Sequence, residues 1–390
     1  MTTSTTSLTT GLLSEADCSI DDFAALVHQQ TQLADYPHAD AVESNVLIYR
    51  ERLRAAAGDP AQRTAVQAEL ARALTDGPGI VVFKQAFEDL SVVDRATDAF
   101  LAQIDAEKAA GVTGGDHFAK PGANDRVWGA LDKLAINAPE VFADYYANDL
   151  IALISQAWLG PSYQVTSQVN VVNPGGQAQV PHRDYHLGFM DAATAARFPA
   201  HVHRLSAALT LQGAVAHCDM PIETGPTLYL PYSHQYEPGY LAFHLPEFTA
   251  YFGEHYVQLS LEKGDAAFFN PALFHGAGTN VSTDVRRMAN LLQISSAFGR
   301  AMETVDRVAM CRALFPVLLE KNTAGVSDSY LNNIIAASAE GYAFPTNLDR
   351  DQPVDGLAPQ TQAALVRQAL DEKWDETRFS DALTAQAYRR

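Results

Sequence analysis

The sequence has few cysteines, a deficit of basic residues and no long hydrophobic run. Its three cysteines are widely separated and odd in number, which argues against a disulfide framework or a CxxC zinc site. The 27 Lys and Arg residues stand against 46 Asp and Glu residues, and the net charge of −19 repels nucleic-acid phosphates and anionic membranes. Neither a run of about eighteen apolar residues nor a signal-peptide pattern is present. We therefore expect a soluble, cytoplasmic protein with reduced thiols and with neither a nucleic-acid nor a membrane partner.

Helical and β patterns occupy different parts of the chain. A short β-branched run at 79–87 predicts one early strand. From 163 to about 300, short β-rich runs alternate with Pro, Gly and Asp turns, which is typical of an antiparallel barrel or jelly roll. Apolar residues at helical spacing predict helices towards both ends, at 19–34, 60–77, 91–110, 139–160 and within 301–390.

These patterns predict one large domain. With 47% hydrophobic residues, the chain can bury a sizeable core. We expect a mainly β core at about 163–300, flanked by N- and C-terminal α-helices, within a single domain spanning 16–390. Residues 1–15 are rich in Ser and Thr, and we predict that they are disordered. The glycine-rich segment 111–125 lacks periodicity, which indicates a long loop that could act as a lid.

The segment "VPHRDYHLGF" at 180–189 raises the question of a metal site. On a strand, residues two apart face the same side, so His182 and Asp184 can point at one ion while Arg183 faces away. An ion such as Fe(II) accepts two imidazoles and one carboxylate on one face and keeps its other positions open. The second imidazole is best supplied by His275, which ends an apolar strand and precedes small residues. His186 shares the parity of His182, but a facial triad needs only two imidazoles, so we leave it outside the metal shell.

Two further groups of polar residues accompany these ligands. Arg286 alternates with Met288 and Asn290 on one predicted strand face, and its planar fork matches a carboxylate, which indicates an acidic cosubstrate. A register slip of one residue would exchange the strand faces on which Arg286 and Arg287 lie. On the preceding strand, one polar face is predicted to line the cavity, and it consists of Gln164, Thr166, Gln168 and Asn170.

These segments, taken together, resemble the phytanoyl-CoA dioxygenase family of Fe(II)/2-oxoglutarate oxygenases. The resemblance rests on His182-Arg183-Asp184, on "ETGPTLYLPYSH" at 223–234, on "GDAAFFNPALFHGAG" at 264–278, and on an arginine eleven residues past His275. The early strand in "DGPGIVVFKQAF" is also similar, so the likeness spans roughly residues 76 to 300. Any one of these motifs is weak, whereas four in the right order are specific.

The resemblance implies a double-stranded β-helix (jelly roll, cupin-like) that binds Fe(II), 2-oxoglutarate and O2. His182, Asp184 and His275 would be the iron ligands, and Arg286 would hold the distal carboxylate of 2-oxoglutarate. The implied reaction couples oxidation of a small organic molecule to decarboxylation of 2-oxoglutarate to succinate and CO2. The retained Asp184 favours hydroxylation, or a related oxidation, over halogenation, because related halogenases carry a small residue there.

The resemblance also suggests contacts with the cosubstrate. Gln168 and Asn170 are candidates on the strand before the metal motif. The family often uses a Ser or Thr as well, and Ser206 and Thr210, both in the predicted strand 204–215, are the alternatives here. The substrate itself is not indicated, and a homodimer is left open.

Two other functions fit the same residues. A cupin-like metalloenzyme would use the same three ligands without 2-oxoglutarate, and its activity would not depend on Arg286. A non-catalytic barrel that binds a small acid would need no metal. A lone HxD pair occurs often by chance, and it is the added contexts of His275 and Arg286 that favour the oxygenase.

Overall fold

The computed structural model describes residues 11–111 and 123–390 of the protein. These residues form two compact units, each built from separate stretches of the chain. The first unit comprises residues 11–86, 123–125 and 170–291 of the described chain, and the second comprises 87–111, 126–169 and 292–390. The sequence patterns predict a single domain over 16–390.

A mixed eight-stranded sheet with the order β1-β2-β3-β9-β6-β11-β5-β4 is the main feature of the first unit, and β4, β5 and β11 continue into residues of the second. Strands β2 and β3 pair in parallel, and β3, β9 and β6 are antiparallel neighbours. A three-stranded sheet has the order β10-β7-β8. The strands are β1 (Ala41–Glu43), β2 (Val46–Tyr49), β3 (Ile80–Phe83), β4 (Asn124–Val127), β5 (Gln164–Val172), β6 (Thr210–Ala216), β7 (Leu228–Leu230), β8 (Val257–Gln258), β9 (Ala266–Phe269), β10 (Phe274–Gly276) and β11 (Arg287–Ser295).

Helices of the first unit precede and interrupt these strands. They are α1 (Ile20–Val27), α2 (Glu51–Ala57), α3 (Pro60–Thr75), α8 (Ala192–Ala195), α9 (Ala200–Ala208), α10 (Gly239–Ala242) and α11 (Pro246–His255), with short 3-10 helices η2 (Glu15–Asp17), η3 (Leu33–Asp35), η4 (His186–Phe189), η5 (Ile222–Thr224) and η6 (Ser233–Gln235). Helix α3 begins with Pro60 after Asp59, whose carboxylate accepts a hydrogen bond from the Ala61 amide. An Asp followed by a Pro is a pattern that predicts the start of a helix.

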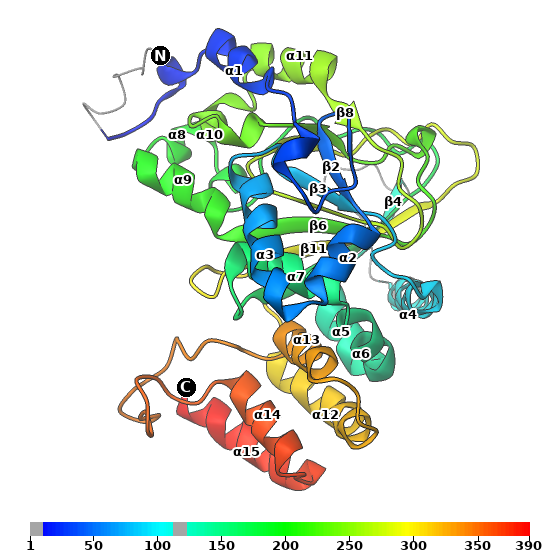
Figure 1. Ribbon diagram of the computed structural model, residues 1–390, viewed down its shortest axis with the longest axis vertical. Coiled ribbons are helices and arrows are strands. Elements are labelled where there is room, and N and C mark those ends of the chain that lie inside the picture. Colours follow the sequence, from blue (N-terminus) through cyan, green and yellow to red (C-terminus); the bar gives the residue numbers. More distant parts are fainter. Residues whose placement is uncertain (1–10, 112–122) are drawn as a thin grey trace. The chain divides into compact units, whose positions relative to one another are not determined.

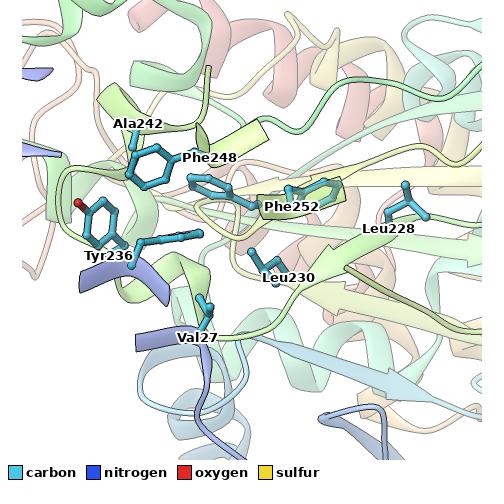
Figure 2. Packing of buried hydrophobic residues seen from close by; sticks show 9 residues of the cluster. Val27, Leu228, Leu230, Tyr236, Ala242, Phe248 and Phe252 are labelled. Atoms are coloured by element: carbon cyan, nitrogen blue, oxygen red, sulfur yellow. The ribbon is translucent and has the colours of Figure 1, made fainter. Parts of the chain in front are cut away.

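Apolar clusters hold this unit together, and two of them bear on the position of β10 and the two sheets. One brings Tyr229 of the small sheet against Ala267 and Phe269 of the large sheet, so the two sheets pack against each other. In the other, side chains from α1, β7, α10 and α11 converge, as Figure 2 shows for Val27, Leu230 and Phe248. Because β10 contributes Phe274 to this second cluster, the residue next to His275 is fixed by core packing.

The second unit is largely helical. Helices α12 to α15 lie in one group, coloured yellow to red in Figure 1, and α12 contacts the other three. The buried Arg307 at the start of α12 pairs with Glu340 at 2.9 Å and donates to the carbonyl of Val165. The helices are α4 (Leu90–Ala109), α5 (Ala130–Asn137), α6 (Pro139–Tyr146), α7 (Asp149–Leu159), α12 (Arg307–Thr323), α13 (Asp328–Ser338), α14 (Gln362–Asp371) and α15 (Glu376–Arg389).

Some predicted elements differ from the structure. The predicted strand 204–215 is wrong in its first half, because α9 runs to Ala208 and the strand begins only at Thr210. The predicted helix 139–160 is two helices, since Asn148 breaks the run by accepting hydrogen bonds from the amides of Leu150 and Ile151.

The predicted disorder and the predicted lid fall partly outside the described residues. Residues 1–10 of the segment 1–15, and residues 112–122 of the loop 111–125, are not described. Within 11–15, Leu13 is buried against Leu241, and the Gly11 carbonyl accepts from the amide of Ala200. Among the described helices, none has the length and apolar character that a membrane crossing requires.

His234 is a buried histidine whose charge should govern acid stability. Its Nε2 lies 3.0 Å from the Thr75 carbonyl, and its ring fills the space beside Gly79, where a Cβ would come within 2.4 Å of Nδ1. Burial lowers the pKa of His234 from 6.5 to about 3. The folded protein therefore keeps this ring neutral over a pH range in which the unfolded chain is protonated.

We expect the free energy of unfolding to fall by about 1.4 kcal/mol per pH unit on account of His234 alone as pH drops below 6.5. The loss should continue until pH approaches 3, where the folded protein also takes up the proton. Urea unfolding at several pH values would measure the slope, and His234→Gln should make it shallower. The surface variant His201→Gln serves as the control and should keep the wild-type slope. Equal slopes in all three proteins would contradict the prediction.

Candidate metal site

Three side chains of the first unit converge on one point. One ligand atom each from His182, Asp184 and His275 lies within 4.8 Å of the others. Nε2 of His275 is 3.3 Å from Oδ2 of Asp184, and Nε2 of His182 is 3.8 Å from Oδ1 of the same carboxylate. The structure thus brings together the three residues that the sequence predicted as ligands.

Backbone pairing of two distant segments creates this convergence. The amide of His182 donates to the carbonyl of His275 at 3.0 Å, and the amide of His275 donates to the carbonyl of His182 at 3.2 Å. The Asp184 amide then donates to the carbonyl of Pro271 at 2.9 Å. The predicted strand at 180–189 is therefore only an isolated bridge at His182, but the alternation of side chains that the prediction needed is retained.

The alternation ends immediately after Asp184. Tyr185 and His186 both have positive φ, 61° and 46°, which is rare for residues with side chains. His186 consequently starts a 3-10 helix and is not part of the ligand cluster, although it shares the parity of His182 in the sequence. Strained backbone of this kind is concentrated at functional sites.

Both imidazoles are held in the orientation that a metal requires. Nδ1 of His182 lies 2.9 Å from the Val180 carbonyl, and Nδ1 of His275 lies 2.8 Å from the Leu273 carbonyl. Because a carbonyl oxygen only accepts, each Nδ1 carries the proton and each Nε2 presents a lone pair. Two lone pairs and a carboxylate then face one another, an arrangement that a bound cation stabilises.

The Asp184 carboxylate is kept ionised and oriented. Burial opposes its ionisation, but in the metal-free protein protonated imidazoles of His275 and His182 and the amide of Gln212 favour the charged form, and the pKa of Asp184 falls to about 2. A bound cation would take the place of those ring protons. Nε2 of Gln212 donates to Oδ2 of Asp184 at 2.5 Å, while the buried Oε1 of Gln212 has no hydrogen-bond partner among the described residues. Gln212 is not among the residues predicted from the sequence, although it is the one long polar side chain in the apolar run "ALTLQGAVA".

Removing the Gln212 hydrogen bond should weaken metal binding. We expect Gln212→Met, which keeps the length of the side chain, to lower the affinity for a divalent metal by about 10- to 100-fold, the usual cost of losing an outer-shell partner. Competition with a chelator would measure the affinity. Gln235→Met removes hydrogen bonds to the carbonyls of Asp76 and Gly77 instead and is the matched control. Equal losses in the two variants would contradict a specific role for Gln212.

Arg286 does not occupy the buried position that its spacing predicted. Its side chain is 51% exposed, pairs with Asp125 at 3.0 Å and donates to Asn173 at 3.1 Å. The register of β11 instead buries its neighbour Arg287, which is the exchange that a slip of one residue produces.

Arg287 is a buried arginine without an acidic partner. It is 7% exposed, and its Nη1 donates to the Thr224 carbonyl at 3.2 Å. Among the described residues, no carboxylate lies within 4.0 Å of it, and burial lowers its pKa to about 10. The phenol of Tyr229 is close enough to interact with its charge, and Tyr229 pairs directly with His275 across the small sheet. The guanidinium of Arg287 is therefore within electrostatic reach of a residue that pairs with the candidate ligand His275.

Two of the other predicted cosubstrate residues, Gln168 and Asn170, have hydrogen-bond partners within the protein. Gln168 belongs to the second unit, where its amide donates to Glu303 at 3.3 Å. Burial raises the pKa of that Glu303 carboxyl. Oδ1 of Asn170 accepts from Asn124 at 3.4 Å. Thr210 is buried as the first residue of β6, whereas Ser206, its alternative, lies on α9 rather than on a strand.

Comparison with known proteins gives one family. The family model described as phytanoyl-CoA dioxygenase (PhyH) matches residues 75–288, which is more than half of the 390-residue chain and contains all three candidate ligands. No curated protein matches the chain.

Several solved structures are similar to parts of the chain. The non-heme alpha ketoglutarate dependent epimerase SnoN from nogalamycin biosynthesis has 22% identity and a TM-score of 0.41, over 61% of this chain and 85% of its own. The carbocyclase SnoK from the same biosynthesis has 21% identity and a TM-score of 0.42, over 59% and 83%. HygX from Streptomyces hygroscopicus, solved with nickel and 2-oxoglutarate, has 16% identity and a TM-score of 0.41, over 60% and 90%.

Proposed function

Because the chain belongs to the phytanoyl-CoA dioxygenase family, we propose that it is an Fe(II)/2-oxoglutarate-dependent oxygenase of a small organic molecule. The observation that carries the proposal is the convergence of His182, Asp184 and His275 with both Nε2 lone pairs turned toward the carboxylate. Two imidazoles and one carboxylate form the ligand set of non-heme Fe(II) oxygenases. We also propose that the two sheets form the double-stranded β-helix of this family.

Some residues of the site would bind the metal, and another would bind the cosubstrate. His182, Asp184 and His275 would hold Fe(II), which supplies the site at which 2-oxoglutarate and O2 are brought together and activated. Arg287 would hold the distal carboxylate of 2-oxoglutarate, because a buried guanidinium without an acid is stabilised by a carboxylate that its fork can bind with two hydrogen bonds. Arg286 is less suited to this role, since Asp125 already neutralises it.

Asp184 also bears on the type of reaction. Its carboxylate occupies the ligand position that related halogenases leave to a halide, and Gln212 holds it there. We therefore propose hydroxylation or a related oxidation, such as desaturation or ring closure, of a small molecule. The net charge of −19 supports the view that neither nucleic acid nor an anionic membrane is a partner.

The test is 2-oxoglutarate turnover. Protein prepared without oxygen, mixed with Fe(II) and 2-oxoglutarate and then exposed to O2, should release succinate, and candidate metabolites that are substrates should stimulate the release. Omitting Fe(II) should remove it. Oxidation of a metabolite that proceeds equally well without 2-oxoglutarate would identify a different class of metalloenzyme, and a metal-free protein that still binds small acids would indicate a binding protein.

A further inference from the structure

We propose that Arg183, whose side chain is turned away from the metal ligands, is a positioning residue that fixes the two ligand-bearing segments against each other. The inference rests on the proposed metal site and concerns how the site is held together. Arg183 stands between His182 and Asp184 in the sequence, so the contacts that fix the position of Arg183 also restrain the backbone that carries both ligands.

The guanidinium is buried and bound to a single loop. Arg183 is 2% exposed, and its Nη2 donates to the carbonyl of Ser233 at 2.6 Å and to the carbonyl of Tyr236 at 2.9 Å. The segment 182–184 is thereby tied to the loop that connects β7 with α10.

The same group contacts the second ligand segment. The guanidinium carbon lies 5.0 Å from the ring centre of Tyr240 and 5.3 Å from that of Phe274, the residue immediately before His275. The amide of Phe274 in turn donates to the hydroxyl of Ser233 at 2.8 Å. Ser233 therefore accepts from Arg183 through its carbonyl and from Phe274 through its hydroxyl, and it joins both segments at the rear of the site.

A hydrophobic side chain in place of Arg183 would not reproduce these contacts. No carboxylate of the described residues forms an ion pair with Arg183, so its charge is compensated by carbonyl oxygens and aromatic faces. Burying a guanidinium in this way is costly, and hydrogen bonds with defined directions are what it offers over a hydrophobic side chain. A segment that carries metal ligands needs such directed hydrogen bonds, because its ligand atoms must keep one orientation.

Gly239 supplies an independent way to displace the guanidinium. A Cβ at Gly239 would come within 2.0 Å of the guanidinium carbon of Arg183. The φ of Gly239 is outside the left-handed region, so the backbone there does not require glycine. The absence of a side chain at this position is explained by the space that Arg183 occupies.

The experiment measures Co(II) affinity and thermal stability in the wild type and four variants. Gly239→Ala should push the guanidinium aside and weaken Co(II) binding by about 10-fold or more, as loss of an outer-shell contact does. Arg183→Lys should lose less, because an ammonium can still donate to the two carbonyls. In the Arg183→Lys/Gly239→Ala double variant the shorter head group leaves room for the new methyl group, so Co(II) affinity should recover toward that of Arg183→Lys alone. Gly253→Ala is the matched control, since a Cβ there meets no atom within 4 Å.

The outcomes separate positioning from simple stabilisation. Recovery of both Co(II) affinity and the visible absorption spectrum of bound Co(II) in the double variant supports the proposal. Gly239→Ala protein that is less stable but binds Co(II) like the wild type overturns it, and so do additive losses in the double variant. If Gly239→Ala does not fold, Arg183→Met decides: weakened binding supports the proposal and unchanged binding overturns it. A wild-type protein that binds no Co(II) would instead overturn the proposed metal site itself.

Discussion

Replacing His275 by alanine should abolish metal-dependent turnover. The change removes one of three ligands, so we expect metal affinity to fall by more than the roughly 100-fold that an outer-shell partner can cost, and succinate release to drop to background. The fold should survive, because Phe274 beside it remains anchored in the apolar core. Metal content after dialysis, chelator competition and succinate release would measure the effect.

His186→Ala is the matched control for this experiment. His186 lies two residues beyond Asp184 but outside the ligand cluster, so its removal should leave metal affinity unchanged. Loss of metal in His186→Ala together with retention in His275→Ala would show that the ligand set is wrongly assigned.

Replacing Arg287 by leucine should remove most of the affinity for 2-oxoglutarate. Truncating one partner of a buried charge pair costs about 2–5 kcal/mol, which corresponds to about 30-fold or more in affinity. Arg287→Lys keeps the positive charge but loses the planar fork of the guanidinium. Its affinity for 2-oxoglutarate should therefore lie between those of the wild type and Arg287→Leu. Calorimetric titration with 2-oxoglutarate in the presence of Mn(II), without oxygen, would measure binding, and metal affinity alone should change little.

Arg286→Leu is the control that the chain itself provides. Its side chain is half exposed and already paired with Asp125, so we expect 2-oxoglutarate affinity close to that of the wild type. The opposite result, a large loss with Arg286→Leu and none with Arg287→Leu, would restore the prediction based on sequence spacing.

The convergence of the three candidate metal ligands could be predicted from the sequence, in part because the constraint on His182 and Asp184 is local. The spacing of His182 and Asp184 fixes a shared face in any extended segment, and the small residues after His275 leave room for an ion. Pairing of the two segments then follows from the family resemblance. The combination of a sheet core with helices was also accessible, since the alternating β-rich runs correspond to strands in most cases.

Arg287 and Gln212 could not be found in this way, for two physical reasons. The choice between Arg286 and Arg287 depends on strand register, which the sequence leaves open where both positions carry the same residue type. Gln212 acts through a contact with Asp184 28 residues earlier in the chain, and nothing in a local pattern reports such a contact. Ser206 is predicted on a strand because its segment has a pattern that suits either a helix or a strand. In the structure this segment forms the helix α9.

The reciprocal amide–carbonyl bonds between His182 and His275 have a practical consequence for an enzyme that has lost its ion. Main-chain pairing, not coordination, sets the spacing of these two imidazoles. Removal of the metal ion with a chelator should therefore leave the arrangement of the two histidines intact. Reloading should then need only dehydration of the incoming cation, and repeated cycles of depletion and reconstitution should restore full occupancy without passage through an unfolded chain.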